Sequence, residues 1–544
     1  MPEAEGSGPQ PRRDQPARVR LALGVLLAVS LGLNAWGIGW GLPSAAGWAP
    51  DELLPSAVLD AVSRGFTGGW HDKYPPLHYY ILATLYLPVL KAEGLRAGMP
   101  VPPEVYHRLF LIGRVLSLLM AAGTLWLVYR CGRELGDRRA GLFAAAIAAL
   151  MAPFAFYAKL ANLDVPYLFW WALSLLFMLK ALSGRGWRDL LLFAATATLA
   201  VTTKDQAYGL YALTAPVLLV ARARARGETG SRAATHLLTE AWRATAVACV
   251  LFAVIHNIPG NPDGFRAHLA LITGRASKDF QEFPNDVGGQ ALLLASTVRH
   301  VVFVLGLPAF LAGMVGLAEA IRERANRWLL LLVPAISFYL SFLCVVLYVY
   351  DRFALPIAFV LAFFGGRTLS RHWDDRCWPR AAARVGAAVI LLYGLTRVIG
   401  VGLSMTYDAR YAAEDWLEAH VRGGSAGAIG PPEYLPRLDG LNGRTIGPAI
   451  ARLEKVAPDF VTVNGDYAAR AEEGSAEHAL YQGLARGALG YREVWRHRYR
   501  APWPWLDTAP LVERSGREPL RSNLGKVNPE ILIYGRTDDP AEAR

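Results

Sequence analysis

Long runs of apolar residues alternate with short polar connections along most of the chain. A run of about twenty apolar residues is long enough to cross the hydrocarbon core of a bilayer as a helix. This hydropathy pattern predicts about eleven membrane-spanning helices. They cover residues 21–42, 110–129, 140–158, 165–182, 190–203, 207–220, 241–258, 298–318, 328–350, 353–369 and 383–403.

The connections between these segments differ in charge on the two sides of the predicted membrane. Arginines cluster in alternate connections, within residues 130–139, 185–188, 222–226, 322–327 and 367–380. The opposite short connections carry few basic residues apart from Lys204 and Arg352. Because arginine-rich connections stay in the cytoplasm, we expect a cytoplasmic N-terminus and an extracytoplasmic C-terminal region. The protein is therefore expected to be integral to the plasma (inner) membrane.

Three large polar stretches fall on the predicted outer face. They are the loops 43–106 and 257–290 and the region 404–544. The first loop contains amphipathic stretches at 53–62 and 77–90, which suit helices lying along the membrane interface.

The region 404–544 has the composition of a small soluble domain. Residues 412–421 predict a helix, and 460–463 and 531–534 predict short strands, with Gly and Pro between them. This pattern favours a small α/β domain. Its Trp503-Pro504-Trp505 is typical of packed core and is also suited to stacking on a sugar.

The predicted fold class is thus a polytopic all-α membrane protein with a small C-terminal extracytoplasmic α/β domain. Three parts are expected along the chain. Residues 1–19 form a disordered basic cytoplasmic tail, 20–403 a transmembrane catalytic domain, and 404–544 the α/β domain.

Composition supports membrane residence and argues against nucleic acid as a partner. Of the 544 residues, 53% are hydrophobic and 19% charged, with a mean hydropathy of +0.25. The net charge of +11 comes with arginines between apolar segments, and no basic stripe is interleaved with aromatic residues. The four cysteines show no metal-binding spacing and are expected to be free thiols.

Several charged residues from distant parts of the chain meet on the predicted outer face. Charges beside a membrane span are costly to keep there and often serve function. The acidic pair follows the first span, a titratable stretch extends through the first loop, and further charges stand at the ends of later spans. These residues are Asp51 and Glu52, then Asp72 and Lys73, with Tyr74 and His78 in the same stretch, then Asp164, Lys204, Asp205, Asp351 and Arg352.

Each of these charges has a structural and a functional interpretation. Asp164 at a helix start is suited to capping it, and Lys204 and Arg352 are suited to snorkelling toward lipid headgroups. The functional interpretation makes a carboxylate a general base for an acceptor hydroxyl or amine. Lysine and arginine then hold a lipid-linked phosphate as the leaving group.

The order and spacing of these motifs resemble the glycosyltransferases of family 39. The resemblance rests on Asp51-Glu52 after the first span, the stretch 73–77 (Lys-Tyr-Pro-Pro-Leu), Leu163-Asp164, and the stretch 352–356 (Arg-Phe-Ala-Leu-Pro). That family has the GT-C fold and includes the protein O-mannosyltransferases and the lipid A aminoarabinose transferase.

The resemblance implies a polyprenyl-phosphate sugar donor, inversion at the anomeric carbon and an extracytoplasmic active site. It implies Asp51 as the catalytic base, and Lys204 and Arg352 as ligands of the donor phosphate. The supporting carboxylates are expected to be Glu52, Asp72 and Asp164, and the further substrate ligands Lys73, Tyr74 and His78.

Three questions stay open at this point. A transporter or flippase of a lipid-linked or polar substrate is the alternative function, and it predicts charges buried in mid-helix and broken helices in paired halves. No cofactor is expected because no histidine-rich ligand spacing is present, although clustered carboxylates are also suited to a divalent metal ion. The acceptor, whether lipid, glycan or protein, is unknown.

Overall fold

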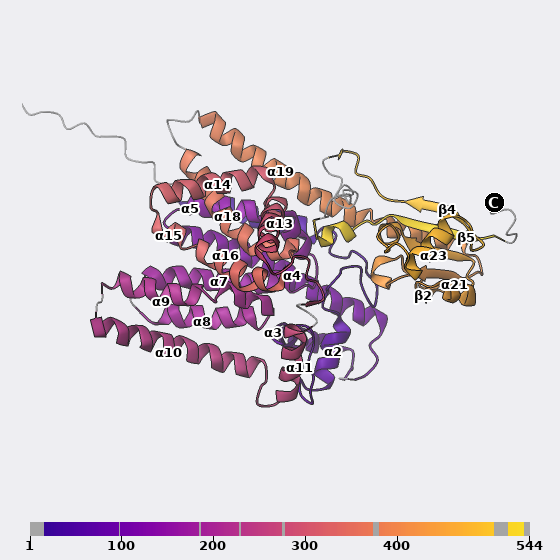
Figure 1. Ribbon diagram of the computed structural model, residues 1–544, viewed down its shortest axis with the longest axis horizontal. Coiled ribbons are helices and arrows are strands. Elements are labelled where there is room, and N and C mark those ends of the chain that lie inside the picture. Colours follow the sequence, from indigo (N-terminus) through magenta and orange to yellow (C-terminus); the bar gives the residue numbers. More distant parts are fainter. Residues whose placement is uncertain are drawn as a thin grey trace, which may run out of the picture.

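The chain folds into a long helical bundle and a smaller domain that contains the sheet (Figure 1). A computed structural model describes residues 16–96, 98–183, 186–227, 230–274, 278–373, 380–504 and 520–537. In Figure 1 the bundle occupies the left and centre, and the yellow and orange α/β domain extends from its right-hand end.

Up to residue 406, all the regular secondary structure of the described residues is helical. The helices are α1 (Pro16–Ala35), α2 (Pro55–Ser63), α3 (Leu77–Ala92), α4 (Pro103–Glu134), α5 (Arg138–Ala149), α6 (Ala152–Tyr157), α7 (Asp164–Ser183), α8 (Arg188–Val201), η1 (Asp205–Leu210), α9 (Thr214–Ala225), α10 (Gly230–Ile255), α11 (Pro262–Thr273), α13 (Val287–Leu305), α14 (Leu307–Arg322), α15 (Asn326–Leu329), α16 (Leu332–Phe338), η2 (Tyr339–Leu343), α17 (Cys344–Val346), α18 (Asp351–Trp373) and α19 (Arg380–Thr406).

Eight helical stretches within the described residues are long and apolar enough to cross a membrane. They are α1, α4, α7, α10, α13, the continuous stretch Asn326–Val346, α18, and α19 with its continuation into the next helix. Three predicted segments correspond to shorter helices. Residues 140–158 form the pair α5 and α6, residues 190–203 form α8, and residues 207–220 form the end of η1 and most of α9. The polytopic helical fold is therefore confirmed, with eight such stretches by length and composition where about eleven spans were predicted.

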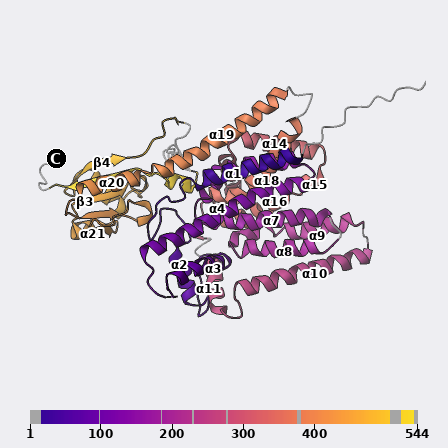
Figure 2. The ribbon, with the colours of Figure 1, turned by 180° about the vertical axis from the view of Figure 1, so that it is seen from behind.

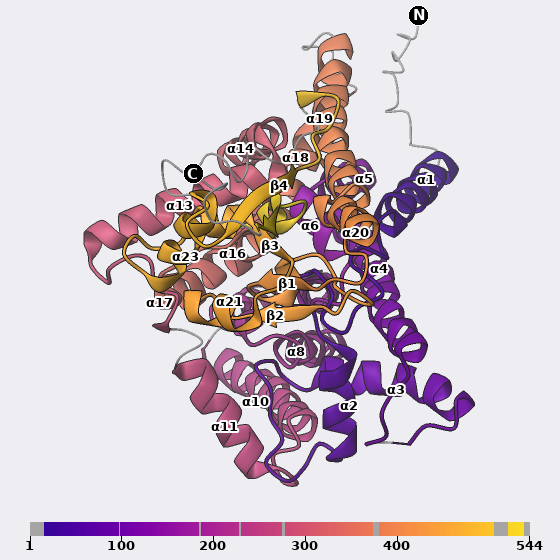
Figure 3. The same cartoon turned by 90° about the vertical axis from the view of Figure 1, so that its right-hand side faces the viewer.

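The prediction of one straight span over 298–318 is wrong. The chain breaks at Gly306, which has a φ of +78° and separates α13 from α14. Pro308 lies in the first turn of α14, where a proline is well tolerated because its missing N–H has no helical partner. Helix α13 is seen end-on in Figure 1 and lengthwise in Figure 3, so it runs across the bundle. The uninterrupted apolar composition hid this break.

The predicted amphipathic stretches of the first loop are helices. Residues 53–62 correspond to α2 and 77–90 to α3. Helix α1 begins at Pro16, so the last residues of the segment 1–19, which was expected to be disordered, are helical, while residues 1–15 lie outside the described part.

Small residues allow the central helices to approach closely. A Cβ at Gly132 of α4 would lie 2.2 Å from the Cα of Gly141 in α5, and one at Gly366 of α18 would lie 2.3 Å from the carbonyl oxygen of Ala140. Close approach at small residues is a common means of packing membrane helices. Helix α5 is thereby held between α4 and α18. From behind, Figure 2 shows α1 beside α4 and α19 on the outside of this core.

The C-terminal part is a small α/β domain, as the composition of 404–544 predicts. Its elements are α20 (Ala409–His420), β1 (Ala426–Ile429), η3 (Pro432–Tyr434), β2 (Arg444–Ile446), α21 (Ile450–Val456), β3 (Phe460–Asn464), α22 (Gly465–Ala468), α23 (Ala476–Ala485), β4 (Tyr491–His497), η5 (Asn523–Lys526) and β5 (Ile531–Arg536). The predicted helix corresponds to α20 and the two predicted strands to β3 and β5.

The sheet of this domain has five strands in the order β2-β1-β3-β5-β4. Strands β2, β1 and β3 are parallel, whereas β5 is antiparallel to both β3 and β4. Figure 3 views the molecule from the end that carries the C-terminal domain, and this sheet lies in front of the end of the bundle. Of the aromatic motif at 503–505, Trp503 is about half exposed, at 53%, and Trp505 lies outside the described residues.

A buried polar junction joins the domain to the bundle. Asp408 lies between α19 and α20, and its carboxylate accepts hydrogen bonds from the indole of Trp40 at 3.0 Å and from the backbone of Asn528 at 2.8 Å. Arg410 forms an ion pair with Asp408 at 2.7 Å, and both side chains are fully buried. Because these partners come from three distant segments, the junction fixes the domain against the start of the first loop.

Candidate active site

A cavity of about 1430 Å³ lies between the bundle and the C-terminal domain. Its walls come from the first loop, the turn after α8, helices α10, α11 and α13, the loop after α11, the segment from η2 to the start of α18, and three parts of the C-terminal domain. Of the residues predicted from sequence to act, it brings together Asp51, Glu52, Lys73, Tyr74, Lys204 and Arg352.

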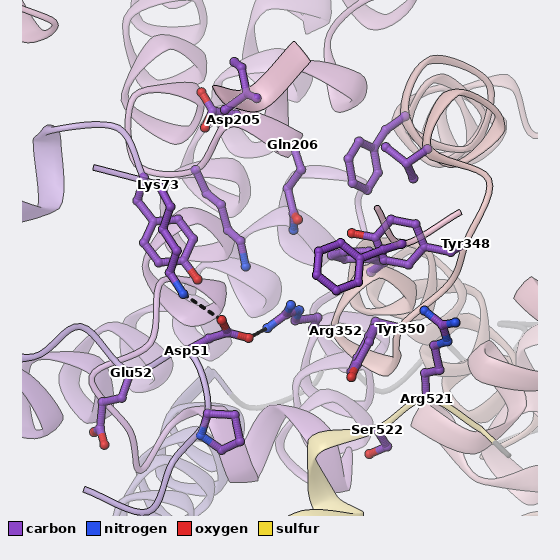
Figure 4. A pocket seen from close by; sticks show the side chains of 18 of the residues that line it. Asp51, Glu52, Lys73, Asp205, Gln206, Tyr348, Tyr350, Arg352, Arg521 and Ser522 are labelled. Carbon is purple, nitrogen blue, oxygen red and sulfur yellow. Dashed lines mark hydrogen bonds and ion pairs between the residues drawn. The ribbon is translucent and has the colours of Figure 1, made fainter. Parts of the chain in front are cut away.

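Asp51 forms the centre of the charged cluster in this cavity (Figure 4). Its Oδ1 lies 2.8 Å from the Nζ of Lys73, and its Oδ2 lies 2.7 Å from Nη1 of Arg352. The Asp51 side chain is 29% exposed. Its backbone has a φ of +60°, which an L residue rarely adopts. Backbone strain of this kind is typical of functional sites.

The two cations control the charge of Asp51. Burial alone would raise the pKa of the Asp51 carboxyl, but the charges of Arg352 and Lys73 outweigh that effect and hold the pKa well below its usual range. The carboxylate is therefore ionised, and it is a weak base while both cations contact it.

A tyrosine ring connects two of the lysines. The Nζ of Lys73 lies 5.0 Å from the centre of the Tyr74 ring, and that of Lys204 lies 5.9 Å from it. Lys204 also forms an ion pair with Asp164 at 2.6 Å. Burial lowers the pKa of Lys204 to about 8, while the charge of Asp164 opposes the shift. Asp164 is fully buried behind Lys204 and does not line the cavity.

Glu52 supports the turn that carries Asp51. Its carboxylate oxygens lie 2.7 Å and 2.8 Å from the guanidinium of Arg114, and both side chains are fully buried. Arg114 also donates to the carbonyls of Ile38 and Trp40. In Figure 4 Glu52 points away from the Lys73–Asp51–Arg352 cluster, so its carboxylate supports the turn and does not face that cluster.

The remaining predicted residues of the first loop lie away from the cavity. His78 is fully buried in α3, and burial lowers its pKa to about 3. Neither of its ring nitrogens has a hydrogen-bond partner among the described residues. Asp72 accepts a hydrogen bond from the backbone of Lys73 at 2.5 Å and lines a separate small crevice. His78 therefore packs beneath the loop, and Asp72 shapes the backbone before Lys73.

A histidine that the sequence did not single out connects the two loops that carry the lysines. Nδ1 of His268, in α11, lies 2.7 Å from the carbonyl oxygen of Asp72, and Nε2 lies 3.2 Å from Oδ1 of Asp205. Burial alone would lower the pKa of His268, but the hydrogen bond and charge of Asp205 outweigh it and raise the pKa. Asp72 precedes Lys73 and Asp205 follows Lys204, so His268 fixes the spacing between the loops.

Arg352 is positioned by its neighbour and by the C-terminal domain. Asp351 accepts hydrogen bonds from the hydroxyl of Tyr157 at 3.0 Å and from the hydroxyl of Ser522 at 2.5 Å. The backbone N–H of Asp351 donates to the carbonyl of Arg521 at 3.0 Å. The segment around 521–522 therefore contacts the bundle directly beside Arg352, as Figure 4 shows.

The C-terminal domain also contributes cavity residues that sequence reasoning missed. They are Glu433, Tyr434, Arg470, Leu520, Arg521, Ser522, Gly525 and Lys526. Nothing in the local sequence marks them, because they reach the cavity only when the domain docks. Arg114 was also missed, although a lone arginine within an apolar segment is a readable signal of a buried partner.

Metal ligands are not gathered in the described part of the chain. No group of three or more His, Cys, Asp or Glu side chains lies close enough together there to hold a metal ion. Around Asp51 the charged groups are arranged as pairs of carboxylate and cation, which suits an anionic ligand that competes for the cations.

Sequence comparison relates part of the chain to one family. Residues 106–256 match the family described as dolichyl-phosphate-mannose-protein mannosyltransferase. No curated protein matches the chain.

Structural comparison covers nearly the whole chain. The oligosaccharyltransferase of Archaeoglobus fulgidus, crystallised with a tethered acceptor peptide, is 12% identical, and the likeness covers 96% of this chain and 89% of that chain at a TM-score of 0.50. ArnT of Cupriavidus metallidurans bound to undecaprenyl phosphate is 15% identical over 72% of each chain, at a TM-score of 0.47. The Pmt1–Pmt2 protein O-mannosyltransferase of S. cerevisiae is 18% identical, covering 50% of this chain and 36% of that chain, at a TM-score of 0.34.

At this low identity the likeness to the archaeal enzyme shows the fold alone. The chain has the GT-C fold of membrane glycosyltransferases, and the resemblance drawn from its motifs is confirmed.

Proposed function

We propose that the protein transfers a sugar from a polyprenyl-phosphate donor to an acceptor hydroxyl or amine on the extracytoplasmic face, with inversion. The observation that carries this proposal is the Asp51 carboxylate held between Lys73 and Arg352 on a large cavity. The family match over 106–256 supports this proposal, because the description of that family names dolichyl-phosphate-mannose, a sugar on a polyprenyl-type phosphate.

The reaction is a single displacement. The acceptor oxygen or nitrogen forms a bond to the anomeric carbon and gives its proton to Asp51. The bond from that carbon to the phosphate oxygen breaks, and its electron pair leaves with the polyprenyl phosphate. Arg352 and Lys204 stabilise the charge that develops on this phosphate. One displacement from the opposite face inverts the anomeric centre.

Donor binding also changes the chemistry of Asp51. The phosphate competes for the same cations that contact Asp51, which are Lys73 and Arg352. As these cations turn toward the phosphate, the pKa of Asp51 rises from its depressed state and the carboxylate becomes a better base. The catalytic base is therefore activated when the donor is bound.

The remaining residues of the cluster position these groups. Glu52 holds the turn of Asp51 through Arg114. Asp164 orients Lys204, and Asp72 orients the backbone of Lys73. The Tyr74 ring lies between the two lysines and limits their movement. His78 packs beneath them.

The donor enters from the membrane side. The cavity lining includes the apolar side chains of Phe252, Phe303, Phe342 and Val345, which suit an isoprenoid chain. With arginine-rich connections in the cytoplasm, the charged end of the cavity and the C-terminal domain lie outside. The protein is accordingly assigned to the plasma (inner) membrane with its N-terminus in the cytoplasm.

Transfer of label separates this function from transport. Purified protein in lipid nanodiscs is incubated with radiolabelled polyprenyl-phosphate sugars and membrane acceptors. We expect label to leave the polyprenyl carrier and appear on the acceptor. A flippase would leave every label on its original carrier, and that result with all donors tested overturns the proposal.

A further inference from the structure

The basic side chains of the cavity divide into two groups by their partners. Three that come from the bundle already contact carboxylates, since Lys73 and Arg352 share Asp51 and Lys204 contacts Asp164. Lys278, in the loop after α11, also lines the cavity and forms no ion pair in the described structure. From the C-terminal domain, Arg521 pairs with Glu282 of the bundle at 3.1 Å. The two other basic side chains of that domain that line the cavity, Arg470 and Lys526, form no such pair in the described structure.

Arg470 and Lys526 line the cavity without a carboxylate partner among the described residues. The Nζ of Lys526 lies 5.6 Å from the centre of the Tyr434 ring. Glu433 lies on the same wall but forms no ion pair with either cation in the described structure. Lys526 is half-buried and Arg470 is exposed at the rim, so together they offer charge to a ligand that arrives from the water side.

The domain holds the backbone segments that carry both residues. Asn464 caps α22, directly before Arg470, and its side chain donates to the carbonyl of Tyr434 at 2.9 Å. Lys526 ends η5, and Leu524 beside it is buried in the core of the bundle. The segment is anchored on one side by the Ser522–Asp351 hydrogen bond. The two cations therefore belong to a preformed surface.

This surface faces the reacting groups. Burial lowers the pKa of Lys526, the charge of Asp51 opposes the shift, and the charges of Arg352 and Arg470 add to it. Lys526 is thus within electrostatic reach of the Asp51–Arg352 cluster, and Arg470 is close enough to repel it. An anion placed between Arg470 and Lys526 relieves that repulsion.

We propose that Arg470 and Lys526 form an acceptor subsite that binds an anionic group, a phosphate or a carboxylate, carried near the hydroxyl or amine that is glycosylated. This inference rests on the proposed transferase function. The bundle cations hold the donor phosphate, and the C-terminal cations hold the acceptor anion in the same cavity. The acceptor class is therefore an anionic molecule, and the α/β domain recognises it.

Binding to the full chain in phosphatidylcholine nanodiscs tests the subsite. Glycerol 1-phosphate serves as the acceptor probe, with glycerol as its uncharged match, and the binding of both is followed by saturation-transfer proton NMR titration at saturating undecaprenyl phosphate. Wild-type protein is expected to bind glycerol 1-phosphate and not glycerol. Arg470→Ala and Lys526→Ala should each weaken this binding about tenfold, which is the loss of one charge-assisted hydrogen bond. Lys526→Arg should retain it.

The controls separate a local effect from a general one. Lys455→Ala and Arg486→Ala remove exposed cations of the same domain outside the cavity lining, and they should leave the affinity for glycerol 1-phosphate unchanged. Undecaprenyl phosphate affinity, read by tryptophan fluorescence, should stay within about twofold in all variants. Absence of undecaprenyl phosphate binding in the wild type would count against the transferase function itself, independently of the subsite.

Three results overturn the subsite. One is no binding of glycerol 1-phosphate to wild-type protein at about 10 mM. Another is unchanged affinity in both alanine variants. The third result is that undecaprenyl diphosphate binds more tightly than undecaprenyl phosphate and that the alanine variants lose this difference. That result would assign Arg470 and Lys526 to a second phosphate of the donor.

Discussion

Replacement of Arg114 by methionine tests the support beneath Asp51. Methionine has a similar length but no charge and no donors. In Arg114→Met, Glu52 loses two hydrogen bonds of 2.7 Å and 2.8 Å, and the carbonyls of Ile38 and Trp40 lose donors at 2.8 Å and 2.7 Å. Glu52 keeps one hydrogen bond, from the backbone of Ala161 at 2.8 Å.

The expected loss of stability follows from burial. Both partners of the pair are fully buried, and removing one partner of a buried ion pair costs about 3–5 kcal/mol. Each carbonyl left without a donor adds about 1 kcal/mol or more, whereas protonation of Glu52 in the variant limits the total. We therefore expect Arg114→Met to reduce the free energy of unfolding by about 4 kcal/mol.

The double variant shows whether the loss comes from the pair. In Glu52→Gln/Arg114→Met no charge remains, so we expect a coupling free energy of about 2 kcal/mol or more between the two sites. Unfolding by sodium dodecyl sulfate in mixed micelles, followed by tryptophan fluorescence, measures each variant.

A surface ion pair provides the control for that experiment. Arg64 and Asp60 form an exposed i,i+4 pair in the same loop, and Arg64→Met should change the unfolding free energy by less than about 0.5 kcal/mol. An Arg114→Met effect below about 1 kcal/mol, or strictly additive variants, would refute the role assigned to this pair.

Three further outcomes are expected. Because the pKa of Lys204 is lowered by burial to about 8, apparent donor affinity should fall about tenfold as pH rises from about 7 to about 9, and Lys204→Arg should remove that fall; an unchanged pH profile would reject Lys204 as a phosphate ligand. The contact of His268 with Asp205 raises the His268 pKa above 6.5, so the stability that this contact contributes is fully present below pH 6.5 and is lost as pH rises through the raised pKa. The difference in thermal unfolding between wild type and His268→Gln should therefore be largest in acid. A difference that does not change with pH would contradict this role of His268. Ser522→Ala removes a hydrogen bond to Asp351 and should speed backbone hydrogen exchange over 520–527, whereas equal exchange would show that this bond does not anchor the segment.

The sequence predicts the parts of the site that interrupt the apolar pattern. Asp51, Lys204 and Arg352 are recognisable because a charge beside a membrane span is rare and costly. The predicted alternation of the spans places all three on one face, and the structure brings them to one cavity. The helical class and the small α/β domain follow from hydropathy and composition in the same way.

Tertiary contacts decide what the sequence does not predict. Glu52 and Asp51 are neighbours, yet only the position of Arg114 shows that Glu52 faces the interior. His78 lies in the same titratable stretch as Lys73, but the helical turn of α3 buries it. Lys526 follows the bundle by more than a hundred residues, and only domain docking places it on the cavity.

Secondary structure was missed where local signals are weak. The break at Gly306 lies inside a continuous apolar stretch, so hydropathy alone reads through it. Strand β4 is mostly exposed: Tyr491 is buried, Trp495 is partly buried and the other residues are open to solvent. Strands β1 and β2 are only four and three residues long. Short or exposed strands lack the alternation on which strand prediction depends.

The central claim is that Asp51 accepts the proton of the acceptor while the cations beside it hold the donor. Turnover and donor affinity are therefore measured together on purified wild type, Asp51→Asn and the control Asp60→Asn, an exposed carboxylate of α2. Asp51→Asn should lower sugar transfer by about a hundredfold or more, while undecaprenyl phosphate affinity is retained or increased, because Lys73 and Arg352 lose their competing carboxylate. Asp60→Asn should behave as wild type. Sugar transfer at the wild-type rate by Asp51→Asn, with normal donor binding, would contradict the account.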